Sequence, residues 1–284
     1  METGLPSMTN EITNTAAETS AENFHKLSIQ VSLNGLSFCV LDTISNRILA
    51  SESISFGTTL TPYAVKKELE TLFKTHKVSK SAFKEVVVTH RNQLFSLVPK
   101  AMFKEEELAN YLKFNAKILA NDHIAYDDIE NHDMVNVYVP FTNINNYIYD
   151  LFGAFDFMHH GTVLIQTLLG TTMTNGAPVC YIHLAEQQMD ITILSQKKLL
   201  FYNSFSYTTK EDFIYYLLFS LEQLKLDTEE ISVKLFGTIE EGDDIYNICY
   251  QYIKNITISI PDNTNYQLGD LEKETIDFTL LNAL

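Results

Sequence analysis

One order of expected elements occurs twice along the chain, and this repeat limits the folds open to it. From Leu27 to Phe56 the pattern predicts three strands, and the first two are joined by the turn Leu33-Asn34-Gly35. Asn-Gly between two β-rich runs is a strong hairpin signal. Apolar spacing predicts a helix over Pro62–His76, and the run FKEVVVTH predicts a strand over Phe83–His90.

The second half begins near Val179 and has the same order. VCYIHLA, MDITILS and KLLFYNSFSY predict three strands, joined by turns at 186–188 and at Gln196-Lys197. The elements expected after them are a helix, a strand, a helix and a strand, at Lys210–Leu226, Glu230–Gly237, Asp243–Ile253 and Asn255–Pro261. The two halves therefore share a βββαβ order, offset by about 150 residues.

Apolar runs show how these elements pack. Val86–Val88 and Val137–Val139 are continuous apolar runs, as in strands covered on both faces. The helix over Phe213–Leu224 is apolar around most of its circumference, which predicts burial on more than one side. Between the halves, NQLFSLVP predicts a strand, 103–119 a helix and Met134–Pro140 a strand. The prediction is an α/β fold of two duplicated lobes, each a mixed sheet flanked by helices.

The expected organisation has three parts. Residues 1–23 are rich in Thr, Asn and Glu and lack both a basic start and an apolar run, so they predict a disordered tail and not a secretory signal. Residues 24–172 form the first lobe and 173–284 the second. No apolar stretch approaches the roughly 20 residues that cross a bilayer.

Charge and cysteine content narrow the possible partners. The formal net charge is -16, and no Lys/Arg cluster reverses it, so nucleic acid and anionic membranes are poor partners. Cys39, Cys180 and Cys249 each lie in an apolar stretch without a paired motif, which disfavours disulfides and a cysteine zinc site. A reducing, cytoplasmic setting is expected. The 15 tyrosines and 18 phenylalanines, many of the tyrosines in the second half, favour a protein partner or a homodimer.

No catalytic motif is present: the chain has no P-loop, dinucleotide fingerprint, zinc spacing or nucleophile motif. No catalytic residue and no metal ligand is therefore predicted. His183 and Glu186 are conceivable metal ligands, but no further acids or histidines follow at the spacing that a metal site requires. The adjacent pair His159-His160 is interpreted as solvated or loosely packed, because neighbouring residues point to different faces.

Two tandem βββαβ units are the layout of the actin-like, sugar-kinase and Hsp70 ATPase superfamily, which this chain resembles. The stretch VCYIHLAEQQMDITILSQKKLLFYNSFSYTTKEDF resembles the second phosphate loop of its PilM-type and FtsA-type members with the strand and helix that follow. NVYVPFTNINNYIYDLFGAFDFMHHGTVLIQTLL resembles their lead-in to the second lobe, and DLEKETIDFTLLNAL the final helix that packs back on the first lobe. The chain is most similar to an uncharacterised Bacteroidetes family, a domain of unknown function assigned to this fold.

The resemblance implies ribonuclease H-like lobes and a nucleotide site in the cleft between them. The family's first loop pairs an acid with a glycine, where this chain has Ser32 and Gly35. Its second loop has an acid, a glycine and a second acid. In this chain the first acid is replaced by His183 and the glycine by Ala185. Only the second acid is kept, as Asp190.

The adenosine motif of the family, a glycine pair, keeps one glycine here, in Gly237-Thr238. Asp190 is interpreted either as orienting a cation-bound water or, preferably, as a turn residue that caps the hairpin. Asp243 and Asp244 are interpreted as N-terminal acids of the next helix.

The nucleotide site is therefore expected to be degenerate. The preferred hypothesis is a pseudo-ATPase that requires no cofactor and acts as a scaffold or interaction module; on this view the protein is not an enzyme. The alternative is an actin-like ATPase or phosphotransferase that binds ATP with Mg²⁺ weakly in the cleft between the lobes, using Asp190 and the backbone of Gly35 and Gly237. A third possibility is another small ligand in the cleft.

Overall fold

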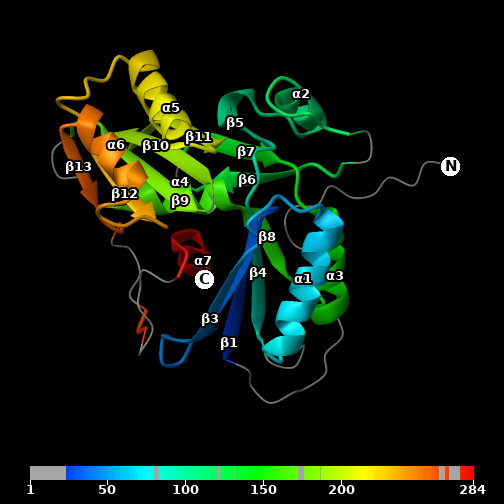
Figure 1. Ribbon diagram of the computed structural model, residues 1–284. Coiled ribbons are helices and arrows are strands. Elements are labelled where there is room, and N and C mark those ends of the chain that lie inside the picture. Colours follow the sequence, from blue (N-terminus) through cyan, green and yellow to red (C-terminus); the bar gives the residue numbers. More distant parts are fainter. Residues whose placement is uncertain are drawn as a thin grey trace. The chain divides into compact units, whose positions relative to one another are not determined.

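Two five-stranded sheets with the same strand order form the framework of the computed structural model (Figure 1). The first has the order β3-β2-β1-β4-β8 and the second β11-β10-β9-β12-β13. In each, the first two pairings are antiparallel and the last two parallel. The strands of the first sheet are β1 His25–Val31, β2 Gly35–Asp42, β3 Arg47–Ser55, β4 Glu85–His90 and β8 Asp156–His159. Those of the second are β9 Val179–Ala185, β10 Gln188–Ser195, β11 Lys198–Ser206, β12 Ser232–Gly237 and β13 Asn255–Ile258. The predicted duplication of mixed α/β lobes is confirmed.

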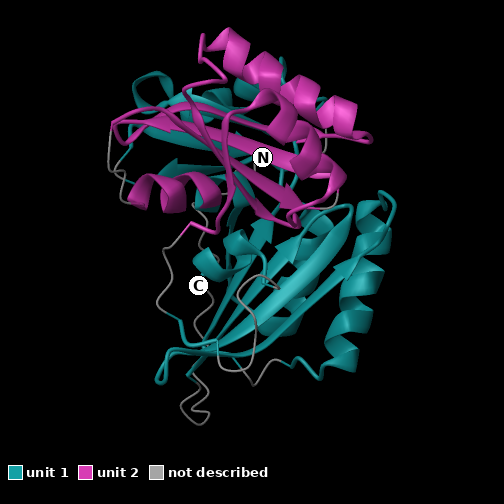
Figure 2. Cartoon of the chain, turned by 60° about the vertical axis from the view of Figure 1, so that its left-hand side comes forward, with its two compact units in different colours: residues 1–163, 265–284 teal, residues 164–264 magenta. Residues whose placement is uncertain are grey.

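The structure describes residues 24–79, 83–119, 122–130, 132–171, 176–185, 187–261, 266–268 and 276–284. Its contacts divide the chain into unit 1, residues 1–163 with 265–284, and unit 2, residues 164–264 (Figure 2). The sequence predicted a first lobe of residues 24–172 and a second lobe of residues 173–284, with the C-terminal helix packing back on the first lobe. The predicted tail, 1–23, lies outside the described residues.

The helices begin where the sequence supplies capping groups. In unit 1, α1 spans Pro62–Thr75 and the side chain of Thr61 accepts the N–H of Ala64. In unit 2, α5 spans Lys210–Gln223, and Thr209 and Asp212 form a reciprocal capping box. The remaining long helices are α3 Thr142–Phe152, α4 His160–Gly170 and α6 Asp244–Tyr252. Asp243 precedes α6 as its N-cap residue, which confirms the predicted position of this acid.

A small third sheet in unit 1 interrupts the first lobe between β4 and β8. It has the order β5-β7-β6, with β5 Phe95–Pro99, β6 Ala125–Ile129 and β7 Met134–Tyr138. The helix predicted over 103–119 is wrong: two short 3₁₀ turns, Lys100–Met102 and Glu105–Glu107, precede a helix α2 of only Leu108–Leu112. After Leu112 the chain turns, because its carbonyl accepts the N–H of both Asn115 and Ala116.

The C-terminal helix α7, Phe278–Asn282, packs on β1 and β2 within unit 1. The Ser28 hydroxyl donates to the carbonyl of Leu280 at 2.8 Å, and Leu280 and Leu281 join a small apolar cluster with Cys39 of β2. The C-terminal helix therefore covers part of the first sheet, on strands from the N-terminal part of the chain.

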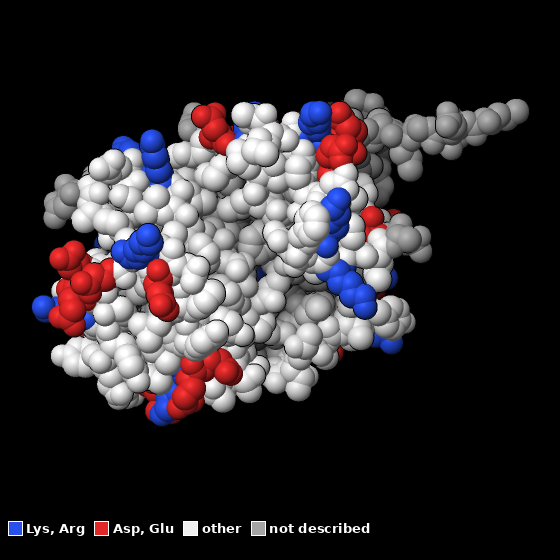
Figure 3. All heavy atoms as spheres, turned by 90° about the horizontal axis from the view of Figure 1, so that it is seen from above, with Lys and Arg blue, Asp and Glu red and all other residues white. Residues whose placement is uncertain are grey.

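Figure 3 shows the charged side chains on one face of the molecule. On the face drawn in Figure 3, basic side chains stand singly or in small groups among acidic and uncharged ones. None of the helices in the described part of the chain combines the length and apolar character needed to span a membrane.

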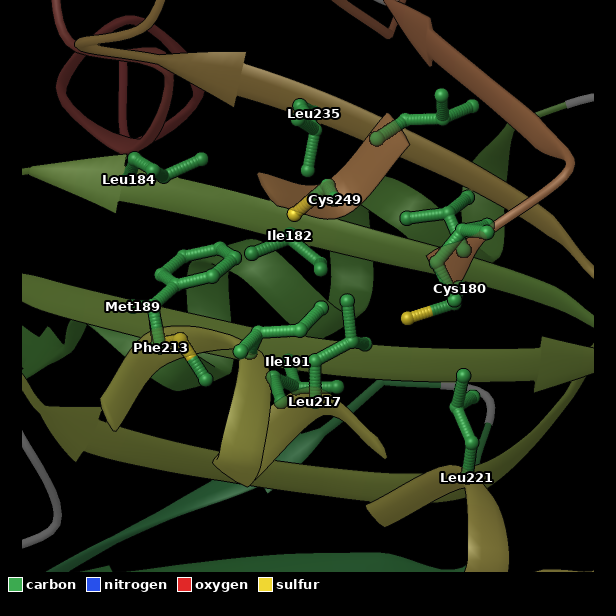
Figure 4. Close-up of a cluster of buried hydrophobic side chains, with 14 of the residues drawn as sticks. Cys180, Ile182, Leu184, Met189, Ile191, Phe213, Leu217, Leu221, Leu235 and Cys249 are labelled. Carbon is green, nitrogen blue, oxygen red and sulfur yellow. The ribbon is translucent and has the colours of Figure 1, made fainter. Parts of the chain in front are cut away.

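The core of unit 2 lies between its sheet and the helices α5 and α6. Alternate residues of β9 and β10, including Ile182 and Ile191, meet Phe213 and Leu217 of α5 and Cys249 of α6 (Figure 4). Because side chains alternate along a strand, the residues between them point to the opposite face of the sheet. Those residues are buried too, and this second face contains several of the predicted site residues.

Candidate functional site

The turn between β1 and β2 is closed by its own side chain. The Ser32 hydroxyl oxygen accepts the N–H of Asn34 at 3.1 Å and of Gly35 at 2.8 Å, and the Ser32 hydroxyl donates to the Gly35 carbonyl at 3.1 Å. Backbone N–H groups of such a turn are the donors that cradle a phosphate in nucleotide-binding loops. Here a phosphate would have to displace the serine from both donors.

The segment after β3 completes this closure. The N–H of Phe56 donates to the Asn34 carbonyl at 2.9 Å, and that of Leu60 donates to the Leu33 carbonyl at 2.7 Å. The Thr59 hydroxyl also contacts the Asn34 side-chain oxygen at 3.0 Å. The first turn is therefore held by a network of local hydrogen bonds.

The second turn, between β9 and β10, needs a left-handed residue and uses Gln187, with a φ of 61°. A glycine would adopt this conformation without strain, whereas a residue with a Cβ pays about 1–2 kcal/mol. Ala185 ends β9 half-buried, and the N–H of Tyr207 donates to the Gln187 carbonyl at 2.9 Å. Glu186, weighed above as a metal ligand, lies outside the described residues.

His183 and Asp190 are direct cross-strand partners in the β9–β10 ladder. His183 Nδ1 lies 3.8 Å from Asp190 Oδ2, and both side chains are 0% exposed. The Tyr202 hydroxyl of β11 donates to Asp190 Oδ1 at 3.4 Å, and the ring of Phe236 stacks on His183 with centroids 5.0 Å apart. The interpretation of Asp190 as a turn cap is wrong, because the residue lies inside β10 and its carboxylate faces His183 and Tyr202.

Gly237 ends β12 beside the backbone of β9. Its φ is +95°, and a Cβ at this position would lie 2.1 Å from the carbonyl oxygen of Leu184. The same carbonyl accepts the N–H of Thr238 at 2.9 Å. Only glycine fits this close approach of two strands, so the residue has a structural reason to be present.

The structure thus brings His183, Ala185, Asp190, Gly237 and Thr238 to one end of the unit 2 sheet, and Ser32 and Gly35 to the first turn of unit 1. Their predicted role in holding a nucleotide stays a prediction.

Unit 1 contains a buried polar network that the sequence did not predict. The carboxylate of Asp127, on β6, accepts the Tyr138 hydroxyl at 3.0 Å, the N–H of His159 at 2.8 Å and the Thr162 hydroxyl at 2.7 Å. The donors from His159 and Thr162 lie at the start of α4, where a helix favours negative charge. Burial beside this carboxylate raises the pKa of Tyr138 well above its usual value.

The histidine pair belongs to the same region, and its interpretation as solvated is wrong. His159 and His160 are both 0% exposed. His159 Nδ1 accepts the N–H of Gly161 at 3.1 Å, so its Nε2 carries the proton and donates to the Asn92 carbonyl at 3.0 Å. The rings of Phe95 and Tyr138 pack against the ring of His159, and the centroids of the two histidine rings lie 4.8 Å apart.

His90, at the end of β4, is held neutral in a similar way. Its Nδ1 accepts the N–H of Phe141 at 3.3 Å, and its Nε2 donates to the Asn145 side-chain oxygen at 2.9 Å. Burial lowers the pKa of His90 to about 4, against a smaller opposing effect of the Asn145 hydrogen bond. These are properties of a structural group and not of a general base near neutral pH.

The chemistry available at the predicted positions is limited. Asp190, the one acid among them, is wholly buried beside a histidine and a tyrosine. Among the described residues, no group of three or more His, Cys, Asp or Glu side chains is arranged to hold a metal ion.

Comparisons with known proteins agree with this architecture. The chain is similar to a Bacteroides thetaiotaomicron protein described as having an actin-like ATPase fold and unknown function, with a TM-score of 0.74 and 21% identity over 84% of this chain and 91% of that one. It is also similar to a chain of the PilM-PilN type IV pilus biogenesis complex, with a TM-score of 0.55 and 12% identity over 91% and 97%. At these identities the likeness shows the fold alone. No curated protein matches the chain. The chain has the actin-like ATPase fold of the similar Bacteroides protein. Residues 14–256 match the family described as "Protein of unknown function (DUF3822)", and the chain therefore belongs to this family.

Proposed function

We propose that the protein is a non-catalytic scaffold or interaction module with a degenerate nucleotide site. The observation that carries this proposal is the Ser32 hydroxyl, which occupies the N–H groups of Asn34 and Gly35. A carboxylate at the same turn would help to hold a metal, whereas a serine bound to its own turn does not. The burial of Asp190 against His183 gives further support.

A protein partner or a homodimer is the expected ligand. The similar PilM chain occurs in a complex with PilN, which supports a role in assembly. The net charge of -16 disfavours nucleic acid and anionic membranes. All three cysteines are free thiols, and this supports a reducing cytoplasmic setting.

Weak ATP and Mg²⁺ binding is the second candidate, and Gly237 favours it. Its backbone is exposed and has the positive φ that lets bare main chain approach a ligand. Its close contact with Leu184 explains the same glycine without a nucleotide, so the scaffold remains the preferred function.

Thermal unfolding of the full chain with millimolar ATP and Mg²⁺ separates the two functions. A ligand at a hundred times its Kd adds about 2.7 kcal/mol to the free energy of unfolding. The scaffold function predicts no rise in Tm beyond that caused by tripolyphosphate with Mg²⁺ at equal ionic strength. An ATP-specific rise that Asp190→Asn removes would refute it. Ser32→Ala serves as the matched variant, because it frees the turn N–H groups without adding a carboxylate.

A further inference from the structure

The outer side of α5 and α6 presents large aromatic side chains to solvent. Tyr215 and Phe219 of α5 are 60% and 46% exposed, and Tyr250 of α6 is 67% exposed. The inner side of α5 is already buried in the core through Phe213 and Leu217. The predicted burial of this helix on more than one side is therefore wrong: the helix is apolar around most of its circumference but is covered on one side only.

These rings form connected stacks. Tyr215 stacks on Phe219 with centroids 6.0 Å apart, and Tyr216 links Tyr215 to Phe205 of β11, with centroids 5.6 Å and 4.7 Å away. On α6, Tyr246 stacks on Tyr250 at 6.2 Å. We call these six residues the aromatic face: Tyr215, Phe219 and Tyr250, which are exposed, and Phe205, Tyr216 and Tyr246, which are half-buried and also pack against the core.

The two helices contact each other within unit 2. Both pack on the same core, and the pair is seen together in Figure 1. Lys210 Nζ lies 3.4 Å from Asp244 Oδ2, which joins the first residues of α5 and α6. Exposed aromatic side chains such as Tyr215, Phe219 and Tyr250 are typical of protein interfaces.

The charge around the aromatic face is acidic. Residues 210–223 and 240–252 contain seven acidic residues and one basic residue, Lys210. The Asp212 carboxylate caps the start of α5, and the Asp243 carboxylate accepts the N–H of Glu240 just before α6. Glu211 and Glu222 are exposed on α5 without such a role in the capping contacts, and they lie in the same helix as Tyr215 and Phe219. A partner therefore gains from positive charge as well as from apolar contact.

We propose that the aromatic face binds a Lys/Arg-rich amphipathic segment of a partner protein, which specifies the interaction surface of the scaffold proposed above and rests on that function. Apolar side chains of the segment pack on Tyr215 and Phe219. Its cations lie over the ring faces and beside Glu211 and Glu222, where cation–π and Coulomb attraction act together. Phosphate backbones and anionic lipids lack the cations that this surface recognises.

The test measures fluorescence anisotropy of a labelled synthetic helix with leucines on one face and lysines on the other, titrated with the full chain. A peptide with glutamates in place of the lysines is the charge control. We expect the lysine peptide to bind and the glutamate peptide not to bind. Tyr215→Gln with Phe219→Gln should weaken binding at least about ten-fold, as for aromatic hot spots. Glu211→Gln with Glu222→Gln should weaken it less and reduce its salt dependence.

Tyr63→Gln is the matched control, because Tyr63 is 65% exposed but lies on α1. Circular dichroism melts establish that each variant is folded. Equal affinity of the wild type and the Tyr215/Phe219 double variant, or failure of the wild type to prefer the lysine peptide, overturns the proposal. A wild-type dimer that this double variant dissociates also overturns it, since the occupant is then a second copy. Either result leaves the scaffold function standing, whereas an ATP-specific rise in Tm refutes that function and does not test this surface.

Discussion

Gly237 of β12 lies against the carbonyl oxygen of Leu184 so closely that a Cβ would stand 2.1 Å from it. The φ of Gly237, +95°, is also one that side chains rarely allow. Gly237→Ala should therefore lower the free energy of unfolding by roughly 3 kcal/mol, through the combined clash and backbone strain. Urea denaturation followed by far-UV circular dichroism measures this loss.

Gly57→Ala is the control for the backbone term. Gly57 has a φ of +65°, and no atom lies within 4 Å of the Cβ that alanine would add. Gly57→Ala should lower the free energy of unfolding by only about 1 kcal/mol, which is the usual cost of placing alanine in the left-handed conformation. Equal losses at both glycines would mean that the close approach to Leu184 contributes nothing.

Asp127→Asn should lower the free energy of unfolding by roughly 2–4 kcal/mol, because the carboxylate accepts three buried hydrogen bonds and an amide cannot. Its new N–H₂ group would face either the Tyr138 hydroxyl or the donors of His159 and Thr162. Urea denaturation measures the difference.

The neighbouring acid is a matched control for the same chemical change. Asp128 is 54% exposed and pairs with Lys100 at 2.8 Å on the surface. Asp128→Asn should leave the urea midpoint unchanged within error, because exposed ion pairs contribute little. A midpoint shift as large as that of Asp127→Asn would show that the buried network has no special role.

The sequence predicted the elements whose signals are local. Asn34-Gly35 marked the first hairpin, and the valine run Val86–Val88 marked a strand covered on both faces. The repeated βββαβ order then predicted two lobes, each with a mixed sheet. These features follow from hydrophobic periodicity and turn chemistry, which act over a few residues.

Features that depend on distant partners were not predictable in this way. Strand β6 was not identified, since its centre contains Asp127 and Asp128, and aspartate is rare in strands. Asp127 is buried because the chain brings it His159 and Thr162, more than 30 residues later. The strand MDITILS was predicted, but the role of its residue Asp190 was not, because the partner Tyr202 comes from the next strand.

The three cysteines should resist thiol reagents in the native protein. All are buried, and burial raises the pKa of Cys249 to about 12 and those of Cys39 and Cys180 further, so almost no thiolate forms near neutral pH. Ellman's reagent should detect no thiol before unfolding and three after it. Thr71→Cys, on the exposed side of α1, should add one fast-reacting thiol. Rapid reaction of the unmodified native chain would contradict this burial.

His90 should make the protein less stable as the pH falls below neutral. Its pKa is lowered to about 4 in the folded state, whereas an unfolded histidine has a pKa of about 6.5. The unfolded chain therefore takes up a proton first, and the free energy of unfolding falls between these two pH values by roughly 3 kcal/mol.

In His90→Asn the new side-chain oxygen can still accept the N–H of Phe141, but nothing titrates at this position. The free energy of unfolding, measured by urea denaturation at several pH values near 5, should rise with pH more steeply in the wild type than in the variant. The difference between the two slopes should be up to about 1.4 kcal/mol per pH unit. Parallel pH profiles for the two proteins would show that His90 is protonated equally in the folded and unfolded states.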